Sequence, residues 1–196
     1  MELKNTENII SKFCSDLIQK ARENLNKDKK RAKGTLFDEM SFDIEKTDDK
    51  IKGVIRFGSA EDYWIFVDQG VQGAGGFKGS GKKRGQGSPF KFSNRQPPLS
   101  AILPWIKLKG LRGRDRGYTK KDGTKVKGTG RFIKDKTFAF IVARSIKQKG
   151  IKRTRFITKP YEDMKTDLAN NIQQAITEDI NEVDNETKVE IKIGGK

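Results

Sequence analysis

The sequence has no histidine and only one cysteine, Cys14. Histidine is the commonest general base and metal-ligating side chain near neutral pH. Catalysis would therefore have to rest on Asp, Glu, Lys or Tyr, and no convergent set of these residues stands out. One cysteine excludes an internal disulfide and a zinc site, and it suits a reducing cytoplasm. The Gly-x-Ser-x-Gly nucleophile motif is also missing, so we expect no enzymatic activity, no cofactor and no metal.

Long apolar runs are missing as well. No run approaches the roughly 20 residues that a membrane-spanning helix requires, and residues 1–7 lead into an amphipathic segment rather than an apolar signal peptide. Only 33% of the 196 residues are apolar, whereas 35% are charged. The core must therefore be small, and part of the chain is expected to lie over a partner or outside any core. We expect one α+β domain spanning residues 1–196, with no membrane contact.

Positive charge is abundant and unevenly distributed. The net charge is +16, and residues 69–135 alone hold 17 Lys and Arg against 3 Asp, a net of +14. Such an excess says more about partners than about fold. A nucleic-acid backbone is one partner that it favours; a solvated loop, or one ordered against an acidic protein, is the other interpretation.

Hydrophobic periodicity predicts the scaffold. A four-residue spacing predicts an N-terminal amphipathic helix with Cys14 on its apolar face. Alternation predicts two antiparallel strands, 36–45 and 50–57, joined by a turn at 46–49. Ser59 is the expected N-cap of a short helix near 63–67. Further helices are expected at 99–108, at 138–149 before Gly150, and from Pro160 onward, the last with one apolar face formed by Tyr161, Met164, Leu168, Ile172, Ala175, Ile176 and Ile180. The expected fold is a small antiparallel sheet packed against N-terminal and C-terminal amphipathic helices, with long basic Gly-rich loops.

Two basic segments interrupt this scaffold. Residues 70–96 are expected to form an exposed Gly-rich loop, and residues 111–131 a hairpin-like insertion around Asp122-Gly123. Residues 186–196 are expected to add a C-terminal strand. Interleaved aromatic residues such as Phe90 could stack on nucleic-acid bases. The cations predicted to face a neighbouring subunit or DNA are Lys78, Lys82, Lys83, Arg84, Lys91, Arg95, Arg112, Arg114, Arg116, Lys120 and Lys121.

Two sequence patterns suggest chemistry and are better explained otherwise. Residues 76–83 nearly match a phosphate-binding P-loop, but Lys83 replaces the magnesium-binding Ser or Thr and Arg84 to Pro89 forbid the following helix. Asp184 with Glu190 and Lys192 resembles a metal-dependent nuclease signature. An alternating edge strand preceded by a turn that contains Asp184 explains this second pattern better.

Several short segments resemble those of one known family when taken in order. They are Lys33–Leu36, entering the first strand; Tyr63–Gly70; Pro97–Gly110; and Phe138–Ile151 followed by Arg155-Phe156-Ile157. Their order is similar to that in the tail-completion proteins of tailed bacteriophages, also described as head–tail joining, minor tail or neck proteins. Asp68 stands where that family usually has Glu. The insertion near Tyr118–Lys127 and the C-terminal strand depart from the family pattern.

The resemblance implies a structural virion protein of the head–tail connector. Such a protein would form a homo-oligomeric ring, a hexamer or dodecamer, that joins the portal or neck to the tail tube around the genomic DNA. It would be assembled in the bacterial cytoplasm and reside in the virion. The residues that the resemblance assigns to the scaffold are Trp64, Asp68, Gly70, Trp105, Gly150 and Phe156. A non-catalytic nucleic-acid-binding protein remains the alternative, and a nuclease the third possibility.

Overall fold

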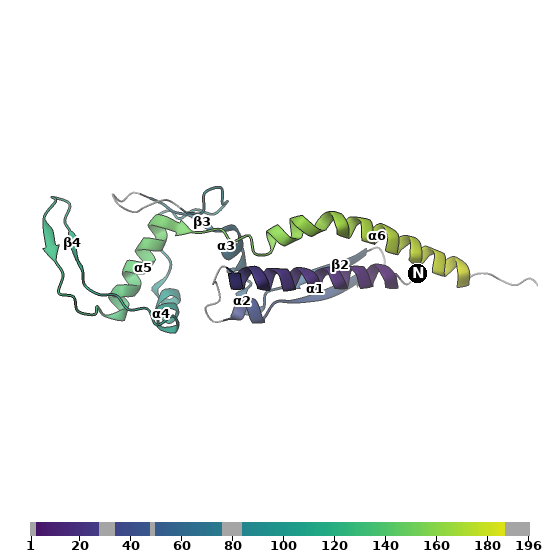
Figure 1. Cartoon of the computed structure of the whole chain (residues 1–196), viewed down its shortest axis with the longest axis horizontal. Coiled ribbons are helices and arrows are strands. Elements are labelled where there is room, and N and C mark those ends of the chain that lie inside the picture. The colour runs from purple at the N-terminus through teal and green to yellow at the C-terminus, as the bar shows by residue number, and fades with distance from the viewer. Residues whose placement is uncertain (1–2, 28–33, 48–49, 76–83, 187–196) are drawn as a thin grey trace, which may run out of the picture. The chain divides into compact units, whose positions relative to one another are not determined.

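The computed structural model describes residues 3–27, 34–47, 50–75 and 84–186, and the side chains as far as residue 182 (Figure 1). This part of the chain is an α+β structure with long helices near both ends and three two-stranded antiparallel sheets, which confirms the predicted fold class. Two compact units can be distinguished. The first holds the described residues of 1–28, 36–61 and 156–196, and the second those of 29–35 and 62–155. The single domain expected from the sequence stays a prediction.

The first unit is a helix pair and a β-hairpin. Its elements are α1 (Lys4–Lys27), β1 (Ser41–Thr47), β2 (Lys50–Arg56), the 3₁₀-helix η1 (Gly58–Ala60) and α6 (Thr158–Glu186), with the short α2 (Thr35–Asp38) at its boundary. Strands β1 and β2 pair from Ser41–Arg56 to Thr47–Lys50. Figure 1 shows α1 lying along the hairpin and beside α6, as the contacts among these elements require.

The core of this unit lies along α1. Cys14, Leu17 and Ala21 are buried there, as the four-residue spacing predicts, and burial raises the pKa of the Cys14 thiol. Gly53 in the middle of β2 lets the helix approach closely, because a Cβ there would come 2.5 Å from Cys14 Sγ. The Phe156 ring is fully buried and packs edge-on against Phe57, with ring centroids 6.4 Å apart.

A buried carboxylate joins the two long helices. Asp179 of α6 is 1% exposed, and its oxygens accept hydrogen bonds from the Asn5 amide (2.8 Å), the Thr6 amide (3.0 Å) and the Thr6 hydroxyl (2.7 Å). These amides belong to the first turn of α1, where helical N–H groups lack intrahelical acceptors. Burial of the carboxylate acts to raise its pKa, but the hydrogen bonds from Thr6 and Asn5 outweigh it and hold the pKa of Asp179 below its ordinary value.

We expect Asp179→Asn to lower the free energy of unfolding at pH 7 by about 1–3 kcal/mol, because the amide leaves buried donors poorly satisfied. A pKa lowered by folding gives a contribution that is present above the unfolded value of about 3.9 and is lost as pH falls through the folded value. The difference between wild type and variant should therefore shrink on acidification below about pH 4. Urea denaturation from pH 7 to pH 3 measures it, with Asp167→Asn, an exposed carboxylate of the same helix, as control. A difference that is constant with pH would contradict this role for Asp179.

Two local predictions in this unit are wrong. The strand expected over 36–45 begins only at Ser41, because α2 occupies Thr35–Asp38. The Arg22 side chain donates hydrogen bonds to the Phe37 and Met40 carbonyls at 2.9 and 3.0 Å. Ser59 caps no helix. Its amide and hydroxyl both donate to Glu39, which lowers the pKa of that carboxyl, and the following helix has Tyr63 at its N-cap without a side-chain cap.

The apolar face of α6 is narrower than expected. Met164, Leu168 and Ile172 are half-buried and Ala175 is buried, whereas the side chains of Tyr161, Ile176 and Ile180 are 48%, 38% and 45% exposed. The reason is that α6 packs along α1, and a single partner helix covers only a narrow stripe. Isoleucines 176 and 180 therefore lie one turn apart on an uncovered side of the helix.

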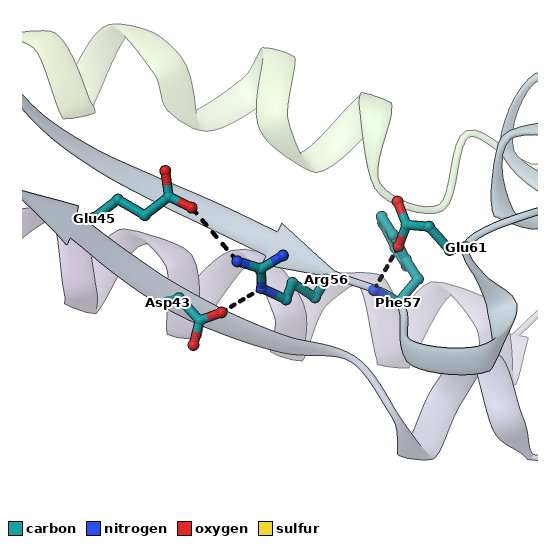
Figure 2. A network of polar contacts seen from close by, with 5 residues as sticks. All are labelled: Asp43, Glu45, Arg56, Phe57 and Glu61. Atoms are coloured by element: carbon teal, nitrogen blue, oxygen red, sulfur yellow. Dashed lines mark hydrogen bonds and ion pairs between the residues drawn. The ribbon is translucent and has the colours of Figure 1, made fainter.

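Several charges on the hairpin of this unit are paired, some of them with one another (Figure 2). The Arg56 guanidinium bonds Asp43 and reaches Glu45 at 3.4 Å, and the bond to Asp43 raises the pKa of Arg56. Glu61 accepts a hydrogen bond from the Phe57 amide at 3.1 Å. Two lysines are paired as well: Lys52 lies 3.7 Å from Glu45, and Lys46 pairs with Glu7.

The second unit contains two helices packed as a pair and two small sheets. Its elements are α3 (Trp64–Gln69), β3 (Val71–Gln72), α4 (Leu99–Leu108), β4 (Gly117–Thr119), β5 (Lys125–Lys127), α5 (Asp135–Lys149) and β6 (Gly150–Ile151). Helices α4 and α5, both predicted, bury Ile102, Ile106, Ala139 and Ala143 between them. Among the described residues, no helix has the length and apolar character needed to cross a membrane.

Candidate functional site

Two helices of the second unit end in the same unusual way. Gly70 ends α3 with φ 70° and ψ −175°, and Gly150 ends α5 with φ 85° and ψ −178°. This backbone region is almost restricted to glycine. The chain then continues into β3 and β6, which pair antiparallel as Val71–Ile151 and Gln72–Gly150. We call these two glycines and two strands the glycine junction.

The backbones at the glycine junction approach too closely for a side chain. A Cβ on Gly70 would lie 2.7 Å from the Arg153 amide nitrogen, and one on Gly150 would lie 2.5 Å from the Gly73 amide nitrogen and overlap the Val71 carbonyl. Glycine is thus required at both positions by conformation and by space.

Part of the Gly-rich segment 70–96 is built into this junction. The buried Ser88 hydroxyl donates to the Gly70 carbonyl at 2.8 Å. The Gln72 amide donates to the Phe90 carbonyl at 2.8 Å, and the Phe92 amide to the Gln72 carbonyl at 2.9 Å. Residues 70–72 and 88–92 of the expected 70–96 loop are therefore built into the junction, because they satisfy backbone groups by pairing. Residues 93–95 are exposed, as predicted.

Residues 153–155 are also hydrogen-bonded to the junction and to the residues beside it. The Thr154 and Arg155 amides donate to the Asp68 carbonyl at 3.1 and 2.8 Å, and the Thr154 hydroxyl donates to the Val67 carbonyl at 2.7 Å. Arg153 reaches the Gly87 carbonyl at 2.5 Å. The segments 63–70 and 150–155, which carry much of the family resemblance, are therefore bonded to each other.

Three of the six scaffold residues expected from the resemblance lie together, and the other three lie in separate places. Asp68, fully buried, lies with Gly70 and Gly150 at the glycine junction. Trp64 is half-buried at the start of α3, Trp105 is 36% exposed on α4, and Phe156 belongs to the core of the first unit. The sequence predicted neither Ser88 nor Thr154 as junction residues, and no local pattern marks them.

The second candidate site is a basic two-stranded arm, residues 112–134, which we call the basic ribbon. Strands β4 and β5 pair as Gly117–Lys127 through Thr119–Lys125, which confirms the predicted hairpin around Asp122-Gly123. Backbone bonds continue the pairing at its base: Asp115 donates to the Arg131 carbonyl at 2.9 Å and Ile133 to the Gly113 carbonyl at 3.0 Å. Figure 1 shows the resulting narrow arm, labelled β4.

Both carboxylates of the basic ribbon accept hydrogen bonds from its backbone amides. Asp115 accepts from the Thr129 amide, the Gly117 amide and the Thr129 hydroxyl, each at 3.0 Å, and these bonds lower its pKa. Asp122 accepts from the Thr124 amide at 2.9 Å, which lowers its pKa in the same way. Both carboxylates therefore stabilise turns and strand pairing.

Register and stacking arrange the cations. Residues opposite each other share a face, so Lys125 and Lys127 lie on one face of the ribbon and the Tyr118–Val126 pair on the other. Near the base, the Arg114 guanidinium lies 4.3 Å from the centre of the Phe132 ring, and the Arg112 guanidinium 5.7 Å from it. The Phe132 ring is 55% exposed.

Every predicted cation that the structure describes is exposed: Arg84, Lys91, Arg95, Arg112, Arg114, Arg116, Lys120 and Lys121. The structure brings the last five together on the basic ribbon. Lys78, Lys82 and Lys83 lie outside the described residues, as does the P-loop-like segment. Lys125, Lys127, Arg131 and Lys134 were missed, although the Lys-Val-Lys alternation after the Asp-Gly turn signals the second strand of the hairpin.

The turn that was expected to contain Asp184 is not formed. Asp184 lies within α6 and not in a turn, because the helix extends to Glu186. The strand expected at 186–196, with Glu190 and Lys192, falls outside the described residues except for Glu186. Within the part of the chain that the structure describes, no group of three or more Cys, Asp or Glu is placed to hold a metal ion.

These two sites give the chain one closely packed backbone crossing and one cationic arm. The crossing can position the loops that leave it, and the arm can bind anionic groups. No family model matches the chain, and no curated protein or solved structure matches it either.

Proposed function

We propose that the chain is a structural subunit of a bacteriophage head–tail connector, which assembles as a closed ring between the portal or neck and the tail. The observation that carries the proposal is the glycine junction. Segments that resemble the tail-completion family are separated by some 80 residues of sequence, yet Asp68 and Gly70 bond or pack directly against residues 150–155. Two segments that resemble the family in sequence thus also meet in the fold, as parts of one scaffold would.

The surface of the subunit suits assembly. Rings form when one patch of a subunit contacts a different patch of the next and the rotation closes. The exposed apolar side chains that could supply such contacts include Phe140, Ile141 and Leu108 in the second unit and Ile176 and Ile180 in the first. Apolar side chains of this size commonly mark contact surfaces where they cluster.

A mass measurement over a range of concentrations tests the ring. Because a closed ring has no free end, we expect one discrete hexameric or dodecameric species, with no larger species as concentration rises. Negative-stain images should show a central hole. An open series of growing oligomers would contradict closure, and a strict monomer, even when mixed with portal and tail tube proteins, would contradict the connector role. A monomer with strong DNA affinity would favour the alternative, a non-catalytic nucleic-acid-binding protein.

A further inference from the structure

We infer that the basic ribbon binds the phosphate backbone of double-stranded DNA without regard to sequence. This goes beyond a ring-forming role, because it assigns a partner to one arm of the subunit and does not require that the ring exist. The inference rests on the charge, the pairing and the shape of residues 112–134.

The charge of the basic ribbon is not compensated. Residues 112–134 contain nine Lys and Arg and two Asp, a net of +7. Asp115 and Asp122 are bonded to backbone amides, and within the described residues no carboxylate forms an ion pair with a ribbon cation. Placing like charges together on a narrow arm is unfavourable unless an anion neutralises them.

The other hairpin of the same chain shows the contrast. Strand β2 contains Lys50-Ile51-Lys52 and β5 contains Lys125-Val126-Lys127, so each strand has two lysines separated by one β-branched residue. On the first hairpin, Lys52 pairs with Glu45, and Arg56 pairs with Asp43 and Glu45. The first hairpin thus neutralises much of its own charge, and the basic ribbon does not.

The shape of the ribbon fits a duplex. The major groove of B-DNA, about 12 Å wide, admits a two-stranded β-ribbon. Contacts from Lys and Arg to the flanking phosphates would be independent of sequence. Stacking on Phe132 holds the Arg114 guanidinium in place, and a preorganised guanidinium loses less entropy when it binds a phosphate.

An acidic protein is the less favoured partner. Protein interfaces have apolar cores from which lysine is depleted. The large apolar side chains exposed on residues 112–134 are Tyr118 and Phe132, and one of these already lies beneath two arginines. Such a surface has much charge and little apolar area, which is the composition of a phosphate-binding surface.

Fluorescence anisotropy with a labelled 24-base-pair duplex of arbitrary sequence tests the inference. The full chain is titrated from 50 to 200 mM NaCl, in the oligomeric state that mass measurement records. If the ribbon neutralises about six phosphates, affinity should fall by about a thousandfold over this range. Lys125→Gln with Lys127→Gln should reduce the salt slope by about 2 and weaken binding roughly 10- to 60-fold at 0.1 M NaCl. The matched control, Lys50→Gln with Lys52→Gln, removes the same charge from β2 and should leave affinity nearly unchanged.

Several outcomes would overturn the inference. Two of them are the absence of duplex binding at 50 mM NaCl and equal losses of DNA affinity in the β5 and β2 variants. A third is tighter binding of a single strand than of the duplex. The fourth is that poly-L-glutamate competes with the labelled duplex as well as unlabelled duplex of the same total charge does. The last outcome would assign the ribbon to an acidic protein. Circular dichroism of both double variants verifies that they fold, as exposed Lys→Gln changes should permit. A ring that fails to bind DNA would overturn only this inference, and a DNA-binding monomer only the connector role.

Discussion

Replacing Phe156 by alanine is expected to lower the free energy of unfolding by about 3–5 kcal/mol. The Phe156 ring is fully buried and packs edge-on against Phe57. The Phe156 carbonyl accepts a hydrogen bond from the Asn24 side chain of α1 at 3.1 Å. Truncation removes buried apolar area and leaves a cavity between the start of α6 and the elements of the first unit that it contacts. A loss of this size is a large fraction of the stability of a typical domain.

Urea denaturation followed by circular dichroism at 222 nm measures the effect, because α1 and α6 dominate the helical signal. Phe132→Ala is the matched control: it makes the same truncation at a ring that is 55% exposed. The control should cost less than about 1 kcal/mol, as exposed substitutions generally do. Equal losses in the two variants would show that Phe156 is not a core anchor.

The second large effect is expected from Gly150→Ala, which should lower the stability of the second unit by more than about 3 kcal/mol. Alanine at φ 85° and ψ −178° is strained. Its Cβ would also overlap the Val71 carbonyl, so β3 and β6 could not remain paired. The strain and the overlap both act where β3 pairs with β6, and neither can be relieved without a shift of the backbone there.

Gly110→Ala is the control for a positive φ without overlap. Gly110 also has positive φ, 61°, but a Cβ there would meet nothing within 4 Å. This control should cost only about 1 kcal/mol, from the backbone conformation. Both tryptophans of the chain, Trp64 and Trp105, belong to the second unit, so tryptophan fluorescence during denaturation reports the loss there. A Gly150→Ala protein as stable as the control would contradict the requirement for glycine at the junction.

The sequence predicted the long elements well because their signals are local. The four-residue spacing from Ile9 to Leu25 lies within α1, and the helices expected at 99–108 and before Gly150 are α4 and α5. The Asp122-Gly123 dipeptide located the turn of the basic ribbon, since glycine readily adopts the positive φ of 88° that Gly123 has there. The exposure of the predicted cations could be inferred directly from their charge.

What the sequence missed depends on residues distant along the chain. Arg22 donates hydrogen bonds to the carbonyls of Phe37 and Met40, and these bonds favour the observed conformation of residues 35–40 over a strand. Ser59 has the composition of an N-cap but bonds Glu39 instead. Neither set of hydrogen bonds can be predicted from a short stretch of sequence, because the partners lie 15 to 20 residues apart.

The candidate sites show the same division. The ribbon cations could be predicted, although the second strand with Lys125 and Lys127 was overlooked. The glycine junction could not, because β3 and β6 have two residues each, which is too short for alternation to be recognised. The family resemblance marked Gly70 and Gly150 without indicating that they meet.

Pairing of Gln72 with Gly150 also makes everything between them a closed loop with its ends tied together. The entropy of closing such a loop grows only with the logarithm of its length, so doubling the length costs about 0.6 kcal/mol. Segments can therefore be gained or lost between α4 and α5 with little effect on the base that holds them. The basic ribbon lies in this interval, at a place where a lineage could acquire a new arm, or exchange one partner for another, without rebuilding the subunit.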